Sequence, residues 1–186
     1  MQNGWSLLLI ADHAPFGGAA EVLSERLSVE MSKGNTTDID NHDDQMRGAG
    51  SLVFSRENRL LNDHPVTRGR NVSERVGRVI SFDGQSLKGP NGSAAILSLS
   101  DSAIDFSPDP PFGPTPRTQT PAGGRAQAIA LSIGEGRVVV LGEAAMLTAQ
   151  VARVPFQDRM RIGISREDID NQQFALNIMH WLSGLL

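Results

Sequence analysis

The chain has 186 residues, of which 39% are hydrophobic and 20% are charged, values typical of a single soluble globular domain. A formal net charge of −4 with scattered Lys and Arg argues against nucleic acid as a partner, and no apolar stretch approaches the roughly 20 residues that a membrane span needs. Cysteine is absent, which excludes disulfides, thiolate metal ligands and a cysteine nucleophile. No signal peptide is visible, so the sequence leaves the localisation unknown.

The N-terminal part predicts a strand, a turn, a helix and then a long loop. Residues 7–11 are a continuous apolar run, which indicates a strand buried on both faces of a parallel sheet. Apolar residues then recur with helical spacing, so we expect a helix over residues 18–30, entered through a glycine pair. Residues 32–50 are polar and rich in Gly, Asn and Asp, and they predict a surface loop.

The middle of the chain predicts short strands and a second long loop. We expect strands over residues 51–55, 78–84 and 94–100, with a helical turn and loop over 57–70. Residues 107–124 hold most of the prolines and predict a loop without regular structure.

A β-hairpin and a helix are the clearest elements of the C-terminal part. Residues 126–143 predict the hairpin, whose second strand is entirely apolar and therefore central in a sheet. Residues 144–152 predict the start of a helix, and residues 168–186 predict an amphipathic helix. Asp170 or Asn171 is expected to cap this last helix.

The beginning of the predicted domain looks incomplete. Asn3 and Gly4 are typical of a turn that ends a helix and feeds a strand, yet two residues precede them. A buried parallel strand also needs a partner on each side. We therefore expect one N-terminally incomplete domain spanning residues 1–186, and a homo-oligomer that completes its sheet.

Four separated blocks carry a resemblance to a known family: "NGWSLLLIADHAPFGGAA", "HPVTRGR", "GRVVVLGEAAMLTAQ" and "NQQFALNIMHWL". Together they resemble an uncharacterised bacterial domain family of the class I glutamine amidotransferase-like superfamily, with relatives of the trehalose-utilisation type. The resemblance implies an α/β, flavodoxin-like three-layer sandwich with a mainly parallel sheet that lacks its first strands, plus the hairpin. The superfamily's nucleophilic Cys would fall near Ala11 and Asp12, so glutaminase activity is excluded.

The candidate catalytic residues are Asp12, His13 and Glu143. Asp12 and His13 end the first strand beside a predicted helix N-terminus, and a carboxylate next to an imidazole suits a general base or a metal ligand. Glu143 ends another predicted strand, and strand ends at one sheet edge converge. The structural alternative is that Asp12 holds its own loop and that Glu143 binds the N-terminus of the helix that follows it.

Further residues are candidates for ligand binding or for structural roles. His64 precedes Pro65 and is predicted to shape a turn. Arg68 and Arg70 can reach an anion, although surface arginines usually pair with nearby carboxylates. The candidate ligand-binding residues are Phe16, Gly17, Gly18, Arg68, Arg70 and Gln150.

The sequence favours a non-catalytic domain, of unknown biological role, that binds a small polar or anionic ligand or another protein, without a cofactor. The alternative is a hydrolase that uses Asp12, His13 and Glu143 around a water molecule or a divalent metal. A serine hydrolase is disfavoured because no Gly-x-Ser-x-Gly motif is present. A third hypothesis is a functionless fragment of a larger protein.

Overall fold

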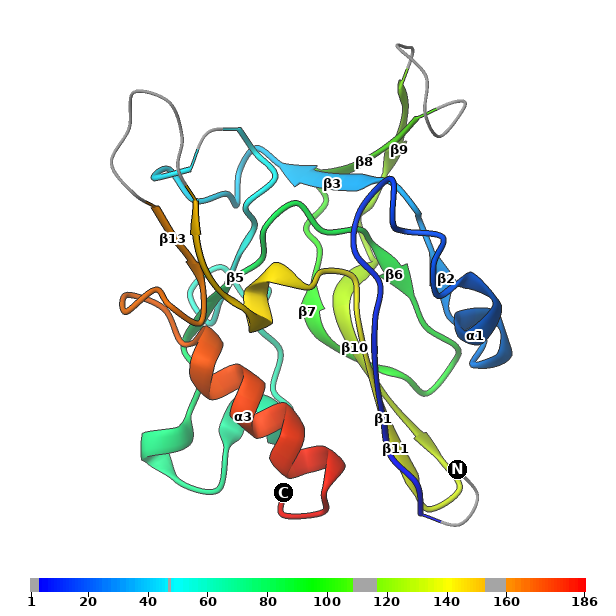
Figure 1. Ribbon diagram of the computed structural model, residues 1–186, viewed down its shortest axis with the longest axis vertical. Helices are drawn as coiled ribbons and strands as arrows, with labels where there is room; N and C mark the ends of the chain where they lie inside the picture. Colours follow the sequence, from blue (N-terminus) through cyan, green and yellow to red (C-terminus); the bar gives the residue numbers. More distant parts are fainter. Residues whose placement is uncertain (1–3, 47, 109–116, 153–159) are drawn as a thin grey trace.

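Most of the regular structure is β-strand, gathered in one six-stranded sheet and three smaller sheets within the residues that the structure describes (Figure 1). The computed structural model describes residues 4–46, 48–108, 117–152 and 160–186. The main sheet contains β1 (Leu7–Ile10), β2 (Glu30–Met31), β6 (Leu87–Lys88), β7 (Ala94–Ser98), β10 (Ala126–Ile133) and β11 (Gly136–Leu141). The smaller sheets are β3 (Asn35–Asp38) with β8 (Ala103–Pro108) and β9 (Arg117–Pro121), β4 (Val53–Ser55) with β5 (Arg78–Ile80), and β12 (Ala149–Ala152) with β13 (Met160–Gly163).

Helices make a smaller contribution to the described part of the chain. The α-helices are α1 (Glu21–Arg26), α2 (Pro65–Arg68) and α3 (Asn171–Leu182), and the 3-10 turns are η1 (Val72–Glu74) and η2 (Ala145–Leu147). Of these, α3 is the longest. In the described ranges, none of the helices has both the length and the apolar character that crossing a membrane requires.

The main sheet is largely antiparallel, so the predicted flavodoxin-like sandwich with a mainly parallel sheet is wrong. The strand order is β1-β11-β10-β6-β2, with β7 also on β10, and β1 with β11 is the one parallel pair among the described strands. A tight turn joins β10 to β11, and such a turn permits antiparallel pairing alone, whereas parallel neighbours need a long crossover that is usually helical. The helices α1 and α2 are too short to supply the two outer layers of such a sandwich.

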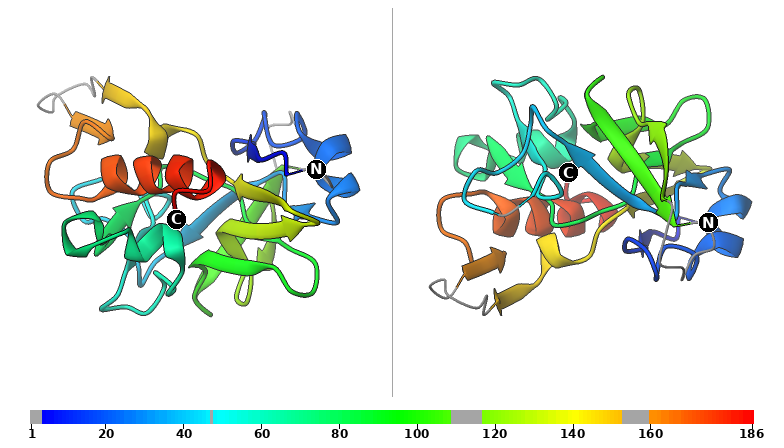
Figure 2. Two further views of the ribbon diagram at one scale, coloured as in Figure 1. Left: turned by 90° about the horizontal axis from the view of Figure 1, so that it is seen from below. Right: turned by 90° about the horizontal axis from the view of Figure 1, so that it is seen from above.

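The hairpin of β10 and β11 is confirmed as the centre of the main sheet. Val138, Val139, Val140 and Leu141 are completely buried, because the two faces of β11 contribute to two different apolar clusters. Val139 and Leu141 pack with residues of α3, while Val138 and Val140 pack with a cluster near α1 and β2. Figures 1 and 2 show α3 and α1 on opposite sides of this hairpin.

The exposure of β1 differs from the prediction. Its residues are apolar, but β1 lies at the edge of the main sheet and pairs with β11 alone among the described strands. Ile10 is therefore 36% exposed. The described chain supplies one neighbour for β1, and completion of the sheet by a second copy stays a prediction. Asn3 of the predicted preceding turn lies outside the described residues.

Both predicted long loops contain strands. Residues 32–50 include β3, whose Asp38 accepts hydrogen bonds of 2.6 Å from the hydroxyls of Ser100 and Ser102. In the same segment, the buried Asp43 lies 2.5 Å from the Arg166 guanidinium. Residues 107–124 include β9, which pairs with β8, and residues 109–116 of this predicted loop lie outside the described residues. These polar segments form strands because distant residues pair with their buried polar groups.

Two predicted helices are shorter than expected or missing. The helix predicted over residues 18–30 is reduced to α1, because the backbone of Ser28 turns to a φ of +56° and Val29 is buried under the main sheet. The helix predicted at residues 144–152 is instead η2 followed by β12. The strands predicted at 51–55, 78–84 and 94–100 are confirmed as the shorter β4, β5 and β7.

The C-terminal helix is confirmed, with a different role for its predicted cap residues. Phe174, Ile178 and Trp181 of α3 are buried on its apolar face. The carboxylate of Asp170 accepts the N–H groups of Gly77 (2.7 Å) and Arg78 (3.0 Å) and caps no helix amide.

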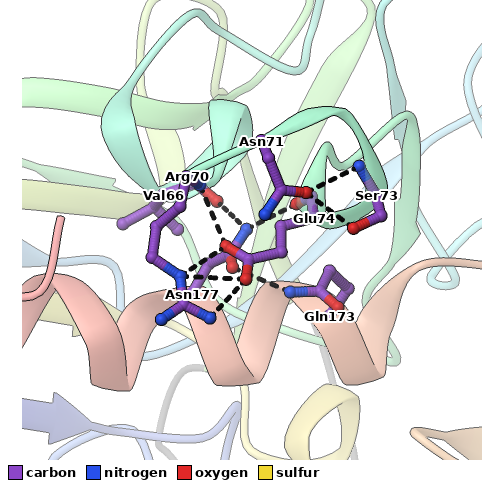
Figure 3. Close-up of polar contacts among 7 residues, drawn as sticks. All are labelled: Val66, Arg70, Asn71, Ser73, Glu74, Gln173 and Asn177. Carbon is purple, nitrogen blue, oxygen red and sulfur yellow. Dashed lines mark hydrogen bonds and ion pairs between the residues drawn. The ribbon is translucent and has the colours of Figure 1, made fainter.

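Two buried asparagines connect α3 to the segments packed against it. Asn171 exchanges hydrogen bonds of 2.9 and 2.8 Å with the backbone of Ile80 in β5. Asn177 donates to the carbonyl oxygens of Val66 and Glu74, each at 2.8 Å, and Figure 3 shows it between these two groups. The apolar face of α3 therefore carries two polar anchors that fix the helix against residues 66–80.

We predict that Asn177→Ala lowers the free energy of unfolding by about 1–3 kcal/mol, because two carbonyl groups at a buried position lose their donor. The measurement is urea denaturation of the variant and of the wild type. Leu176→Ala, on the exposed side of the same helix, is the matched control and is expected to change stability by less than about 0.5 kcal/mol. Equal effects of the two substitutions would contradict the anchoring role.

Candidate functional site

Asp12 and His13 form a local turn at the end of β1. Oδ1 of Asp12 accepts the backbone N–H of His13 at 2.8 Å and lies 3.7 Å from Nε2 of the same residue. Nδ1 of His13 lies 2.6 Å from the carbonyl oxygen of Ala14. The carboxylate and the imidazole are thus adjacent, as predicted, and both also hold the turn together.

Glu143 is buried at the end of β11, with 1% of its surface exposed. Its carboxylate accepts the backbone N–H groups of Ala145 and Met146, the latter at 2.8 Å, in the first turn of η2. Burial raises the pKa of Glu143 to about 8, and the negative charge of Asp12 adds to the rise, while these amide donors oppose it. Asp12 is therefore close enough to Glu143 to raise its pKa. Glu143 also binds the N–H groups of the helical turn that follows it, which is the structural role considered as the alternative for this residue.

Two glutamines that the sequence analysis missed lie beside these carboxylates. Nε2 of the buried Gln85 donates to the carbonyl oxygens of Ala11 (3.0 Å) and Asp12 (2.8 Å). The amide group of Gln127 is buried and has no hydrogen-bond partner among the described residues. A Cβ at Gly84 would lie 2.6 Å from Nε2 of Gln127 and 2.9 Å from Cβ of Glu143, so these groups are closely packed. Gln127, which lies among the apolar residues of β10, is the sequence signal that could have predicted this buried polar layer.

The other candidates near this corner have separate positions. Phe16 is 62% exposed, and Gly17 lets the turn pack closely because a Cβ there would lie 2.7 Å from Cα of Lys33. A Cβ at Gly18 would meet no atom within 4 Å. Gln150 lies in β12 and donates to the hydroxyl of Thr148 at 2.7 Å. Across the described ranges, no three His, Cys, Asp or Glu side chains are grouped so that they could hold a metal ion.

Arg68 and Arg70, by contrast, lie at one pocket. This pocket has a volume of about 310 Å³, and we call it the arginine pocket; it is lined by Asp63, Arg68, Gly69, Arg70, Asn71, Val72 and Arg75. Arg68 pairs with Asp63 at 2.6 Å, and Nε of Arg70 lies 2.9 and 3.0 Å from the two carboxylate oxygens of Glu74. No hydrogen bond or ion pair joins the Arg75 guanidinium to any residue in the described part of the chain. The sequence analysis missed Arg75, although it stands in the same arginine-rich segment.

Local structure holds this pocket in shape. His64 begins α2 by accepting the N–H of Val66 at 3.2 Å, which confirms its predicted role in a turn. Gly69 has a φ of +66°, and a Cβ there would lie 2.4 Å from Cβ of Glu74, so glycine is required. Figure 3 shows Arg70 folded against Glu74, and Arg70 holds the pKa of Glu74 at about 2. The backbone between the arginines is thus fixed by its own contacts and by α3.

The fold and these sites define a mostly β domain with a mixed main sheet. Among solved structures, one described as "mmIFT52 N-terminal domain" resembles the chain with a TM-score of 0.62 and 13% sequence identity, over 98% of this chain and 66% of that chain. At this identity the likeness shows the fold alone. The chain spans less than two thirds of the length of that structure.

The other comparisons found no relative: no family model matches the chain, and no curated protein matches it. The resemblance to the glutamine amidotransferase-like superfamily is wrong, because the structural neighbour is an IFT52 N-terminal domain and the observed fold is mostly β. The four sequence blocks were local patterns of strand, turn and helix, and such patterns recur in unrelated folds.

We predict that the free energy of unfolding falls by about 1–2 kcal/mol between pH 6.5 and pH 8 because of Glu143. Its pKa rises from 4.5 to about 8 on folding, so the native state holds more protons than the unfolded state in this interval and loses stability as they leave. His64 acts in the opposite direction, because burial lowers its pKa to about 4 from its ordinary value of 6.5. Its contribution to stability rises by about 0.4 kcal/mol across this interval, which is smaller than the fall caused by Glu143.

The measurement is urea denaturation at both pH values. Glu143→Gln is expected to remove most of the dependence, while Glu135→Gln, an exposed glutamate in the hairpin turn, keeps it. A Glu143→Gln protein with the wild-type pH dependence would refute the assignment.

Proposed function

We propose that the chain is a non-catalytic binding domain that takes an anionic group of its ligand in the arginine pocket. The observation that carries the proposal is that three arginines line one pocket, and that the Arg75 side chain is unpaired in the described chain. Guanidinium groups bind carboxylate and phosphate oxygens with two parallel hydrogen bonds. The ligand class is therefore a compact anion, either free or as part of a larger molecule.

The existing ion pairs do not close the pocket to such a ligand. Arg68 and Asp63 are 52% and 66% exposed, and exposed pairs of this kind contribute at most about 1 kcal/mol. A multiply charged anion replaces one such pair with several charge-assisted hydrogen bonds. Arg70 remains on Glu74, while Arg68 and Arg75 are available to the ligand. The net charge of the whole chain is negative, so attraction of an anion comes from the arginines at this pocket and not from the net charge of the protein.

The hydrolase hypothesis has less support from the geometry. Both carboxylate oxygens of Glu143 are occupied by backbone amides, and its side chain has almost no contact with solvent. A general base has to reach the proton that it removes. Catalysis by Asp12, His13 and Glu143 stays a prediction, as do the absence of a cofactor and of a nucleic-acid partner, the single domain and the fragment hypothesis.

We predict that inorganic phosphate, pyrophosphate or citrate raises the melting temperature of the wild type and that Arg75→Glu weakens this binding at least about tenfold. Reversing the charge removes one attraction and adds one repulsion at the pocket. Titration calorimetry gives the affinities, and added salt is expected to weaken them. Arg26→Glu, an exposed arginine on α1, is the matched control with unchanged affinity. The proposal fails if none of the three anions binds, or if the control loses as much affinity as Arg75→Glu.

A further inference from the structure

The free edge of β1 presents unpaired backbone groups. The N–H of Ala11 donates to the carbonyl oxygen of Leu141, so the odd-numbered residues of this segment direct their backbone groups to β11. Backbone groups alternate along a strand, and those of Leu8 and Ile10 therefore point away from the sheet. Outside the β1–β11 ladder, no backbone hydrogen bond of Leu8 or Ile10 is formed with any residue in the described ranges.

Apart from its length of four residues, β1 lacks the features that normally prevent pairing at a sheet edge. Natural edge strands carry a Lys, a Pro, a bulge or an inward-facing charge. The sequence of β1 is Leu-Leu-Leu-Ile, and its register with β11 is regular. Trp5, just before the strand, is 74% exposed, and Ile10 is exposed at its other end. Unpaired backbone and exposed apolar side chains thus occur together on one short segment.

We propose that β1 pairs with β1 of a second copy of this chain, antiparallel and about a twofold axis at Leu9, so that two main sheets become one. The outward-facing Leu8 then exchanges two backbone hydrogen bonds with Ile10 of the second copy, and the symmetry repeats this pair. The proposal goes beyond anion binding and does not depend on the arginine pocket.

Complementary side chains argue for a second copy as the occupant of this edge. Residue numbers that meet across the axis sum to 18, which brings Leu8 opposite Ile10 and Leu7 opposite Ala11. These side chains are all apolar, so no charged group is placed against the second copy along the strand. Ile10 lies beside Leu8 of the second copy on the face that α3 covers in each subunit, which removes its exposed surface from water.

The first test is the mass of the full chain in solution, measured by analytical ultracentrifugation over a range of protein concentrations. We expect a reversible dimer for the wild type and a monomer for Ile10→Lys, since a charge at the edge opposes pairing. Ile39→Lys changes another exposed isoleucine that lies outside β1, and it is expected to remain dimeric. Circular dichroism and thermal unfolding confirm that both variants are folded.

The second test fixes the register, using the absence of native cysteine. Under mild oxidation, the double variant Leu8→Cys/Ile10→Cys is expected to form a disulfide-linked dimer, because these two positions meet across the axis at a spacing that a disulfide spans. Each single variant places its cysteine opposite a residue without a thiol and is expected to stay unlinked.

A wild type that is monomeric at every concentration overturns the proposal, and so does equal loss of the dimer in both lysine variants. Equal cross-linking of the single variants overturns the register. Because the anion titrations use a different surface, their result does not change with either outcome.

Discussion

The fold depends on one strand, β11, being apolar on both faces. Its alternate residues enter two separate clusters, and its two edges pair with β1 and with β10. Residues of α3 pack in one cluster and residues flanking α1 in the other, and the two clusters meet through β11 and its neighbour β10, which also enters both. A polar substitution at Val139 or Val140 would place an unpaired group at the centre, where no water is available to satisfy it. β1 runs parallel to β11, so the strand ends that carry Asp12 and Glu143 lie at the same end of the sheet. On one face of β11, α3 packs and holds the segment that carries the arginine pocket.

Polar contacts then decide how the outer segments attach to this centre. Buried carboxylates and amides pair with residues far away in the sequence: Asp43 with Arg166, Asn171 with Ile80, and Asp105 with the hydroxyl groups of Thr36 and Ser86. Buried polar groups of this kind cost free energy unless they are paired, so each pair is also a constraint on position. The segments that look like loops in the sequence are held by these pairs and not by apolar surface.

Prediction from the sequence succeeded where the signal is local. The hairpin and α3 were predicted because an all-apolar strand beyond a glycine turn and a 3.6-residue repeat are both contained in short windows. The strands β3 and β9 were missed, because "NTTD" and "RTQTP" become strands only through pairing with β8. The exposure of Ile10 in β1 was also missed, since an apolar run alone does not tell how many strands flank it. Of the candidate sites, Arg68 and Arg70 came from local sequence. Arg75 was missed although it stands in the same segment, whereas Gln85 required the tertiary fold.

Glu143 and Arg75 differ in whether the fold already provides partners for their charged groups. Glu143 has an unusual pKa because the end of β11 is buried, and the amide groups of η2 use the same oxygens that a substrate would need. Burial, with an added contribution from the charge of Asp12, therefore accounts for its raised pKa. Arg75 has no side-chain partner in the described residues, and it lines one pocket with Arg68 and Arg70 on a backbone that Gly69 and Asn177 fix. A ligand site needs polar groups that the fold holds in place but leaves without hydrogen-bond partners. The arginine pocket meets this condition through Arg75. The carboxylates of Asp12 and Glu143, by contrast, already accept hydrogen bonds within the fold itself.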